Sequence, residues 1–277
     1  MQTDRRRSRS ALAWYGVLIG LAVLVLFPVY MALVRALSQP RSYVEAGQPP
    51  WPVHVEWDVF ARAFTEGDLG QKFLVSGIVT VVIVAGQLVT STLAAYAFTF
   101  LTFPFRRAAF VATMATLMLP IEVTLIPNVR TIRGLGWLNS YPGLVAPFLA
   151  TALGIFLLRQ AFRGIPRDLL DASRLDGFGH LGFLRRVALP VTRPTIAAFA
   201  VVSFLAAWNQ YTWPRAVVTE GDWETLQIGL KTLSTGSADH SNVAVAAALL
   251  TALPVLAVLV LLQRHLVRGL TTGAVKG

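Results

Sequence analysis

The segment that decides the fold is residues 73–105, which read FLVSGIVTVVIVAGQLVTSTLAAYAFTFLTFPF. It contains no Asp, Glu, Lys or Arg. A helix rises about 1.5 Å per residue and needs about 20 apolar residues to cross roughly 30 Å of hydrocarbon. The segment is therefore long enough to span a bilayer as one helix.

Five further segments have a similar character. Four also lack charged residues and are long enough to span, namely residues 10–34, 134–158, 194–214 and 240–263. A fifth, residues 108–129, carries one charge, Glu122, between two prolines. Sheets exposed to lipid must close into barrels of short alternating strands, whereas these segments are continuously apolar. We predict an all-α integral membrane protein with six transmembrane helices.

The distribution of charge predicts the topology. Hydrophobic residues make up 55% of the chain and charged residues 14%. The net charge of +10 does not by itself indicate binding to nucleic acid. The basic residues gather at the ends of particular spans, which is the pattern that sets membrane topology. These are the N-terminal tail, Arg106 with Arg107, residues 159–193 and the C-terminal tail. We predict cytoplasmic termini, although Arg130 and Arg133 lie on the opposite side.

The chain is predicted to form a single transmembrane domain over residues 1–277, with an external loop at residues 37–71. Within that loop the spacing of Trp57, Phe60, Ala61 and Phe64 predicts a short helix at the membrane interface. There is no cysteine, and the histidines lack the spacing of metal ligands. We therefore expect no metal site.

The polar segment between the fourth and fifth spans, residues 164–193, has helix signals of its own. Residues 163–177 read RGIPRDLLDASRLDG. Pro166 suits the first turn of a helix and Gly177 suits the left-handed position after it. A second short helix is predicted from His180 to about Val187, ended by Leu189-Pro190. The small Ala172 and Ser173 predict a surface that a partner can approach closely.

This segment resembles the EAA loop of binding-protein-dependent ABC transporter permeases. Their pattern is E-A-A, three residues, G, nine residues, I, one residue, L-P. The matching residues here are Asp171-Ala172-Ser173, Gly177, Val187 and Leu189-Pro190. Asp replaces Glu, Ser replaces the second Ala and Val replaces Ile, and each change conserves size or charge. Residues 117–123, 208–214 and 263–270 are similar to the carbohydrate-uptake branch, most closely to the second permease of glycerol-3-phosphate importers and the smaller maltose permease.

The resemblance implies the fold of a type I ABC importer permease in the bacterial inner membrane. Residues 164–193 would then be a cytoplasmic pair of coupling helices. The implied ATPase-coupling residues are Asp171, Ala172, Ser173, Asp176, Gly177, Val187, Leu189 and Pro190. The implied partners are a second permease, two copies of a cytoplasmic ABC ATPase and an extracytoplasmic solute-binding protein. The chain has no G-x-x-x-x-G-K-[ST] segment, so we expect a partner to hydrolyse ATP and this chain to need no cofactor.

Candidate solute contacts come from polar and aromatic residues inside the spans. Glu122 is costly in lipid and would line the solute pathway, pair with the other permease or bond at a kink. Trp208, Asn209, Tyr211 and Trp213 end the fifth span, where they would contact a sugar or polyol or form an interfacial aromatic belt. Arg130 and Arg133 would attract an anionic solute or extend to the headgroups.

Two other classes of function are weighed against an importer permease. A six-span secondary transporter or channel would usually need inverted repeats and buried ion sites, and Glu122 alone offers one. A membrane enzyme would gather His, Asp or Glu near one face, and the sequence shows no such cluster. The sequence therefore favours a permease subunit for a sugar or glycerol-phosphate type solute, without deciding between these solutes.

Overall fold

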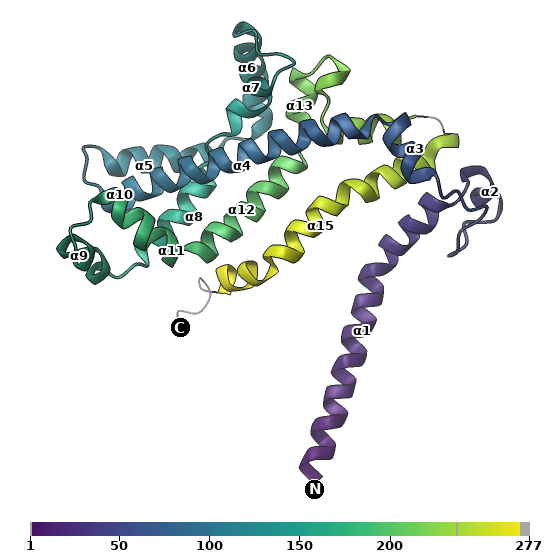
Figure 1. The fold of residues 1–277 in the computed structure, drawn as a ribbon, viewed down its shortest axis with the longest axis horizontal. Helices are drawn as coiled ribbons and strands as arrows, with labels where there is room; N and C mark the ends of the chain where they lie inside the picture. Colours follow the sequence, from purple (N-terminus) through teal and green to yellow (C-terminus); the bar gives the residue numbers. More distant parts are fainter. Residues whose placement is uncertain (1, 237, 272–277) are drawn as a thin grey trace. The chain divides into compact units, whose positions relative to one another are not determined.

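The computed structural model describes residues 2–236 and 238–271, with side chains for 14–120, 122–236 and 239–263. This part of the chain is helical, with one isolated bridge between Ser38 and Val55 as its only β pairing (Figure 1). The longer helices are α1 (Gln2–Leu37), α4 (Leu69–Phe100), α5 (Arg106–Ala115), α6 (Ile121–Gly134), α8 (Ala152–Arg163), α12 (Arg193–Trp208) and α15 (Ser241–Thr271). The shorter ones are α2 (Pro40–Glu45), α3 (Val59–Glu66), α7 (Tyr141–Val145), α9 (Arg167–Leu175), α10 (His180–Phe183), α11 (Leu189–Val191), α13 (Thr212–Val217) and α14 (Leu226–Ser234). The all-α prediction is confirmed.

Six segments are long and apolar enough to cross a membrane, provided that each bent helix pair counts as one span. Three are single helices, Trp14–Leu37, Leu69–Phe100 and Ser241–Gln263. Three are bent pairs, α5 with α6, α7 with α8, and α10–α11 with α12. The pair around α8 bends by 46° and the pair before α12 by 79°. The six-span count thus agrees with the structure.

The third, fourth and fifth spans are broken helices, a feature that the charge-free segments do not indicate. The third breaks at Leu119, which is extended with ψ 116° because the residue before a proline is driven out of the helical region. The fourth breaks between the 3₁₀ turn η2 (Ala146–Phe148) and α8. The fifth ends at Trp208, before the predicted residue 214. A segment without charged residues is compatible with lipid, but the lack of charge does not indicate where its helix breaks.

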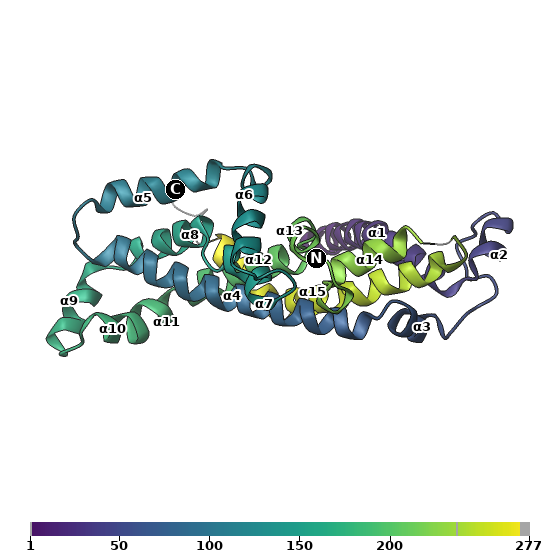
Figure 2. The same ribbon diagram turned by 90° about the horizontal axis from the view of Figure 1, so that it is seen from above.

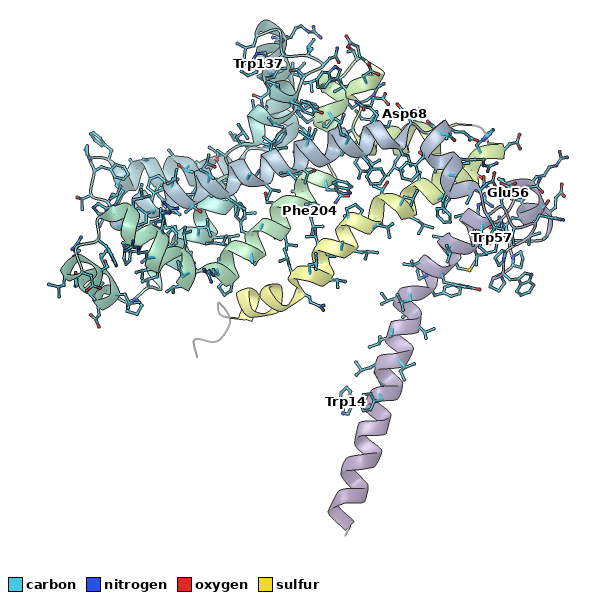
Figure 3. All side chains as sticks on the ribbon, in the orientation of Figure 1. Trp14, Glu56, Trp57, Asp68, Trp137 and Phe204 are labelled. Atoms are coloured by element: carbon cyan, nitrogen blue, oxygen red, sulfur yellow. The ribbon has the colours of Figure 1, made fainter. Side chains whose placement is uncertain are left out.

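The chain packs as two units, and the first comprises residues 1–69 and 229–253. Here Glu56 accepts hydrogen bonds from Arg62 at 2.8 Å and from Asn242 at 2.9 Å, which ties the loop after α1 to the start of α15. Trp14 on α1 is 68% exposed, and its side chain stands clear of the helix (Figure 3). Such an uncovered apolar helix needs lipid or another subunit around it.

The short helix predicted at residues 57–64 lies at Val59–Glu66. Val59 and Ala63 are its buried residues, whereas Trp57 is 79% and Phe64 45% exposed. The predicted apolar face therefore points outward, away from the buried side of this helix. External loop residues Leu69 to Gln71 belong to α4 and not to a loop.

The second unit comprises residues 70–228 and 254–277 and holds two buried apolar clusters. Side chains of α4 satisfy backbone groups at the break before α8. The Gln87 amide donates to the Phe148 oxygen at 2.9 Å, and the Thr90 hydroxyl donates to the Leu149 oxygen at 2.8 Å. A broken helix can exist in lipid only if such partners replace its lost hydrogen bonds. The sequence Gln87-x-x-Thr90 therefore stabilises the fourth span as a broken helix.

Candidate functional site

A helix–turn–helix segment lies between α8 and α12. It comprises α9, α10, the π-helical turn η3 (Leu184–Ala188) and α11, and it lies near the end of α4 that carries Phe100 (Figure 1). Pro166 directly precedes α9, and Asp168 lies in its first turn, where the helix dipole favours a carboxylate. The helix predicted from Pro166 onward is confirmed.

The turn after α9 is fixed by backbone hydrogen bonds. Gly177 has φ +79°, the left-handed conformation that glycine adopts at no steric cost. The Phe178 amide donates to the Ser173 oxygen at 2.9 Å, and the Gly177 amide donates to the Arg174 oxygen at 3.0 Å. These two bonds form a Schellman motif, which satisfies the last carbonyls of the helix. The predicted role of Gly177 as the residue that stops α9 is confirmed.

An aromatic cluster anchors α10 to the membrane helices. The Tyr96 ring of α4 lies 5.0 Å from the Phe100 ring and 6.4 Å from the Phe162 ring of α8. Phe183 of α10 meets the Phe100 ring edge-on at 5.2 Å and is 1% exposed. The Tyr96 hydroxyl also contacts Nδ1 and the backbone oxygen of His180 at 3.0 and 3.1 Å. These packing contacts and hydrogen bonds hold α10 against α4 and α8.

The prediction that Ser173 faces a partner is wrong. Ser173 is 3% exposed, and its hydroxyl donates to the Leu170 oxygen at 2.7 Å. Ser173 lines a small hollow together with Phe178, Gly179 and His180, and the sequence of α9 alone does not reveal this placement. Ala172 is exposed, so the small outward surface consists of Ala172 without Ser173.

The predicted stop at Leu189-Pro190 is also wrong. Both residues lie in α11, which ends at Val191, and Thr192 follows. The π-helical turn η3 ends two residues before Pro190, whose missing N–H and ring would disrupt a regular α-helical ladder. Val187 lies within this turn and packs with Leu189 against the aromatic cluster.

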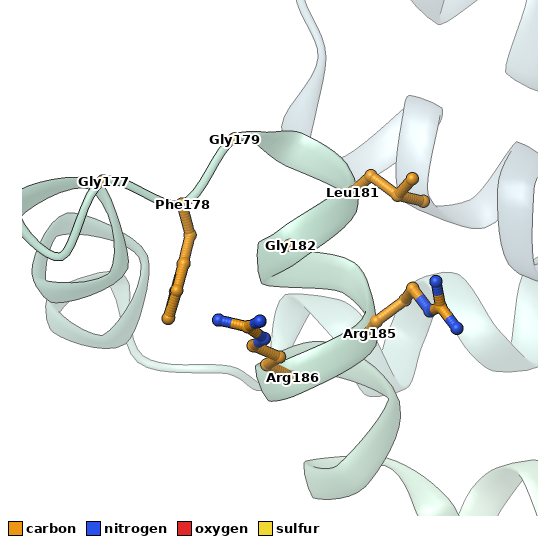
Figure 4. Close-up of a pocket in the computed structure, with 7 residues that line it drawn as sticks. All are labelled: Gly177, Phe178, Gly179, Leu181, Gly182, Arg185 and Arg186. Atoms are coloured by element: carbon orange, nitrogen blue, oxygen red, sulfur yellow. The ribbon is translucent and has the colours of Figure 1, made fainter.

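The outward surface of the segment is apolar and basic. Leu175 at the end of α9 is 90% exposed, and Leu181 on α10 is 64% exposed. A hollow of about 580 Å³ lies beside Leu181 and is lined by Gly177, Phe178, Gly179, Leu181, Gly182, Arg185 and Arg186 (Figure 4). The Arg186 guanidinium lies over the Phe178 ring, 4.5 Å from its centre. A surface of this kind can bind another protein. The signal for it in the sequence was the two leucines, Leu175 and Leu181, within a polar segment.

A second hollow lies where the broken spans meet. It measures about 250 Å³ and is lined by Thr116, Leu119, Thr124, Leu125, Asn128, Pro147, Phe148 and Trp213. The lining comes from the ends of half-helices on both sides of Pro120, from η2 and from α13. Discontinuous helices provide polar groups at membrane depth, and transporters use such breaks as solute sites. Hydroxyl and amide groups beside an aromatic ring suit a polyol or sugar.

The predicted solute contacts are not brought together in this hollow. Trp208 is 5% exposed and stacks on Phe204 at 5.7 Å, so it is a packing residue. Asn209 and Tyr211 are exposed in the break between α12 and α13. Glu122 is exposed in the first turn of α6. Only Trp213 of the aromatic group lines the hollow, and its indole N–H donates to the Gly143 oxygen at 3.1 Å.

Comparisons with known proteins agree with these features. The family model described as "Binding-protein-dependent transport system inner membrane component" matches residues 72–272. The chain is 33% identical over 275 residues to the sn-glycerol-3-phosphate transport system permease protein UgpE of Yersinia enterocolitica, covering 96% of this chain and 98% of that protein. It is 36% identical over 267 residues to the UgpE of Rhizobium meliloti, covering 92% and 93%.

A solved structure shares the fold. It is the crystal structure of a bacterial ABC transporter involved in the import of the acidic polysaccharide alginate. The TM-score is 0.79 at 24% identity, and the match covers 94% of this chain and 97% of that chain.

Proposed function

The chain belongs to the binding-protein-dependent transport system inner membrane components, and on that premise we propose that it forms half of the translocation pathway of an ATP-driven importer. It is a multi-pass membrane permease component and not an enzyme. In this proposal a second permease supplies the other half of the pathway. Two cytoplasmic ATPases and an extracytoplasmic solute-binding protein complete the assembly, and both termini of this chain are cytoplasmic.

The observation that carries the proposal is the anchoring of α10 to α4 and α8. A soluble ATPase can move membrane helices only through a contact that does not deform under load. The aromatic packing of Phe183 and the hydrogen bonds between Tyr96 and His180 supply such a contact. The surface around Ala172, Leu175 and Leu181 would receive the ATPase, so that its closure on ATP moves α10 and the spans together.

In this proposal the residues of the EAA-like loop have different parts in coupling to the ATPase. Ala172 and Leu175 would touch the ATPase, whereas Ser173, Gly177 and Val187 would hold the shape of the segment. Asp171 lies 3.6 Å from Arg174 on the exposed face of α9, and Asp176 ends the helix. Leu189 and Pro190 would link this shape to α12.

The solute in this proposal is a glycerol phosphate or a related polyol or sugar. Support comes from relatives named for sn-glycerol-3-phosphate transport and from the hydroxyl and amide groups of the hollow beside Trp213. Glu122, Asn209 and Tyr211 remain candidates for contacts to solute or to the second permease, since all three are exposed.

The test is to purify this chain from detergent-solubilised membranes, identify the subunits that accompany it and measure ATP hydrolysis with candidate solutes. We expect a P-loop ATPase and a second permease, with hydrolysis stimulated by glycerol phosphate in the presence of the binding protein. If only a neutral sugar stimulates hydrolysis, the proposed solute is wrong, but the assignment as an importer stands. Recovery of this chain alone, without ATPase activity, would overturn the proposal.

A further inference from the structure

The ends of α5 and α8 carry a group of arginines that has no part in the transport mechanism. Helix α5 lies beside α8 in this unit (Figure 2). Arg106 begins α5 and Arg163 ends α8, four residues before α9. Arg106 also donates to the Leu101 oxygen at 2.8 Å, just past the end of α4. Both arginines therefore lie on the same side of the membrane as α9.

A third arginine lies one helical turn deeper. Arg159 precedes Arg163 by four residues on α8, and its guanidinium lies 3.9 Å from the centre of the Phe110 ring of α5. Phe110 in turn follows Arg106 by four residues, so the guanidinium groups of Arg106, Arg159 and Arg163 face the contact between α5 and α8, called the seam below. Arg106 and Arg163 both act on Arg159 by Coulomb repulsion. Like charges in one seam are unfavourable unless an anion lies among them.

Among the described residues, no carboxylate forms an ion pair with these three arginines. The ion pairs formed within the described residues all involve other arginines, a lysine or a histidine. Arg159 Nε is buried and has no hydrogen-bond partner in that part of the chain. A guanidinium carries five N–H donors in a planar fork that matches the oxygens of a phosphate. The seam thus offers charge and donors that a phosphate group would satisfy.

The surroundings of the seam are those of a membrane–water boundary. A hollow of about 500 Å³ beside it is lined by Thr102, Phe103, Phe105, Arg106, Arg107 and Ala108. Phe105 is 85% exposed and has φ +59°, a left-handed conformation that is unusual for a bulky residue. That conformation holds its ring outward beside Arg106 and Arg107. Aromatic rings gather at headgroup level, and basic pockets between spans bind anionic headgroups.

We propose that Arg106, Arg159 and Arg163 bind the phosphate of an anionic phospholipid, with Phe105 seated among the neighbouring headgroups. A phosphorylated solute carries the same chemical group. The lipid is favoured because Phe105 and Arg107 face outward at the edge of the seam. The proposal does not depend on which solute the importer carries.

The test measures phosphatidylglycerol retained by the purified, assembled importer in native mass spectrometry. The double variant Arg106→Gln with Arg159→Gln is compared with Arg41→Gln with Arg215→Gln, which removes the same charge from exposed positions outside the seam. We expect the first to weaken retention about fivefold for each arginine lost and the second to leave it unchanged. Arg163→Gln, at an exposed position, should weaken it about fivefold and covers the case in which the double variant does not assemble.

Equal retention by the two double variants would overturn the proposal, as would a wild-type complex that retains phosphatidylglycerol no better than phosphatidylcholine. Soluble glycerol phosphate is the second arm. If the wild-type complex binds it more tightly than Arg163→Gln does, while both retain phosphatidylglycerol equally, the seam binds the phosphate of the solute, and the lipid assignment is wrong.

Discussion

The hydroxyl of Tyr96 in the second span lies 3.0 Å from Nδ1 and 3.1 Å from the backbone oxygen of His180 in α10. Their rings also meet edge-on, with centres 6.0 Å apart. One side chain of a membrane helix therefore fixes both the backbone and the side chain at the start of α10. In the proposed importer this contact passes the motion of the ATPase to the span.

Replacing Tyr96 by Phe tests this contact. The variant keeps the aromatic packing and loses only hydrogen bonds, each of which contributes about 1 kcal/mol. We expect solute-stimulated ATP hydrolysis to fall about fivefold, while the complex still assembles. Tyr141→Phe is the matched control, because its ring packs on Trp223 and its hydroxyl makes no hydrogen bond within the described residues. Equal effects of the two variants would contradict the role of Tyr96.

Replacing Gly177 by Ala tests the turn after α9. A Cβ at this position meets no atom within 4 Å, so the cost is the left-handed backbone alone, about 1 kcal/mol. We expect faster hydrogen exchange across α9 and weaker stimulation of ATP hydrolysis. Gly134→Ala, at the end of α6, should change neither, because Gly134 has no positive φ and equally open surroundings. An unchanged exchange rate in Gly177→Ala would refute the importance of the turn.

Replacing Leu175 by Ser tests the ATPase-facing surface. Leu175 is 90% exposed, so its loss should leave the fold of this chain intact. We expect less ATPase to copurify, because a leucine buried in an interface contributes about 2 kcal/mol. The control is Leu135→Ser, which removes an exposed leucine at the end of α6. Normal recovery of the ATPase with Leu175→Ser would place the interface elsewhere.

Replacing Asn128 by Leu tests the hollow between the broken spans. Leucine is similar in size to asparagine but has no amide, so the lining loses a hydrogen-bonding group. We expect the solute concentration that gives half-maximal stimulation of ATP hydrolysis to rise about tenfold. Basal ATP hydrolysis should stay the same. Thr131→Val removes a polar group from the same helix at an exposed position outside the hollow. A shift of equal size in both variants would argue against a solute site here.

Several features of the fold could be predicted from residue patterns alone. Long segments without charge located six spans, because lipid tolerates almost no charged side chains. Pro166 and Gly177 located the two ends of α9, because each residue restricts or permits a particular backbone conformation. The resemblance of the segment around Asp171 to the EAA loop led to the family that the comparisons then identified.

Other features depend on contacts that form only in the folded chain. Ser173 is buried beside Phe178, Gly179 and His180, which follow α9 in the chain, and the sequence of α9 alone does not indicate this placement. The hollow beside Trp213 was missed because hydropathy does not report where a helix breaks. Pro120 was the available signal for one break. The break at Asn209 has no proline, and its sign was a pair of adjacent amides, Asn209 and Gln210, within an apolar segment.

The most direct test of the coupling role uses the absence of cysteine from the chain. A single cysteine introduced by Ala172→Cys can carry a photoactivated cross-linker in the assembled importer. The account predicts a cross-link to the P-loop ATPase, and no such cross-link from Leu135→Cys. A cross-link from Ala172→Cys to lipid or to the second permease, with none to the ATPase, would contradict the claim that α9 and α10 couple ATP hydrolysis to transport.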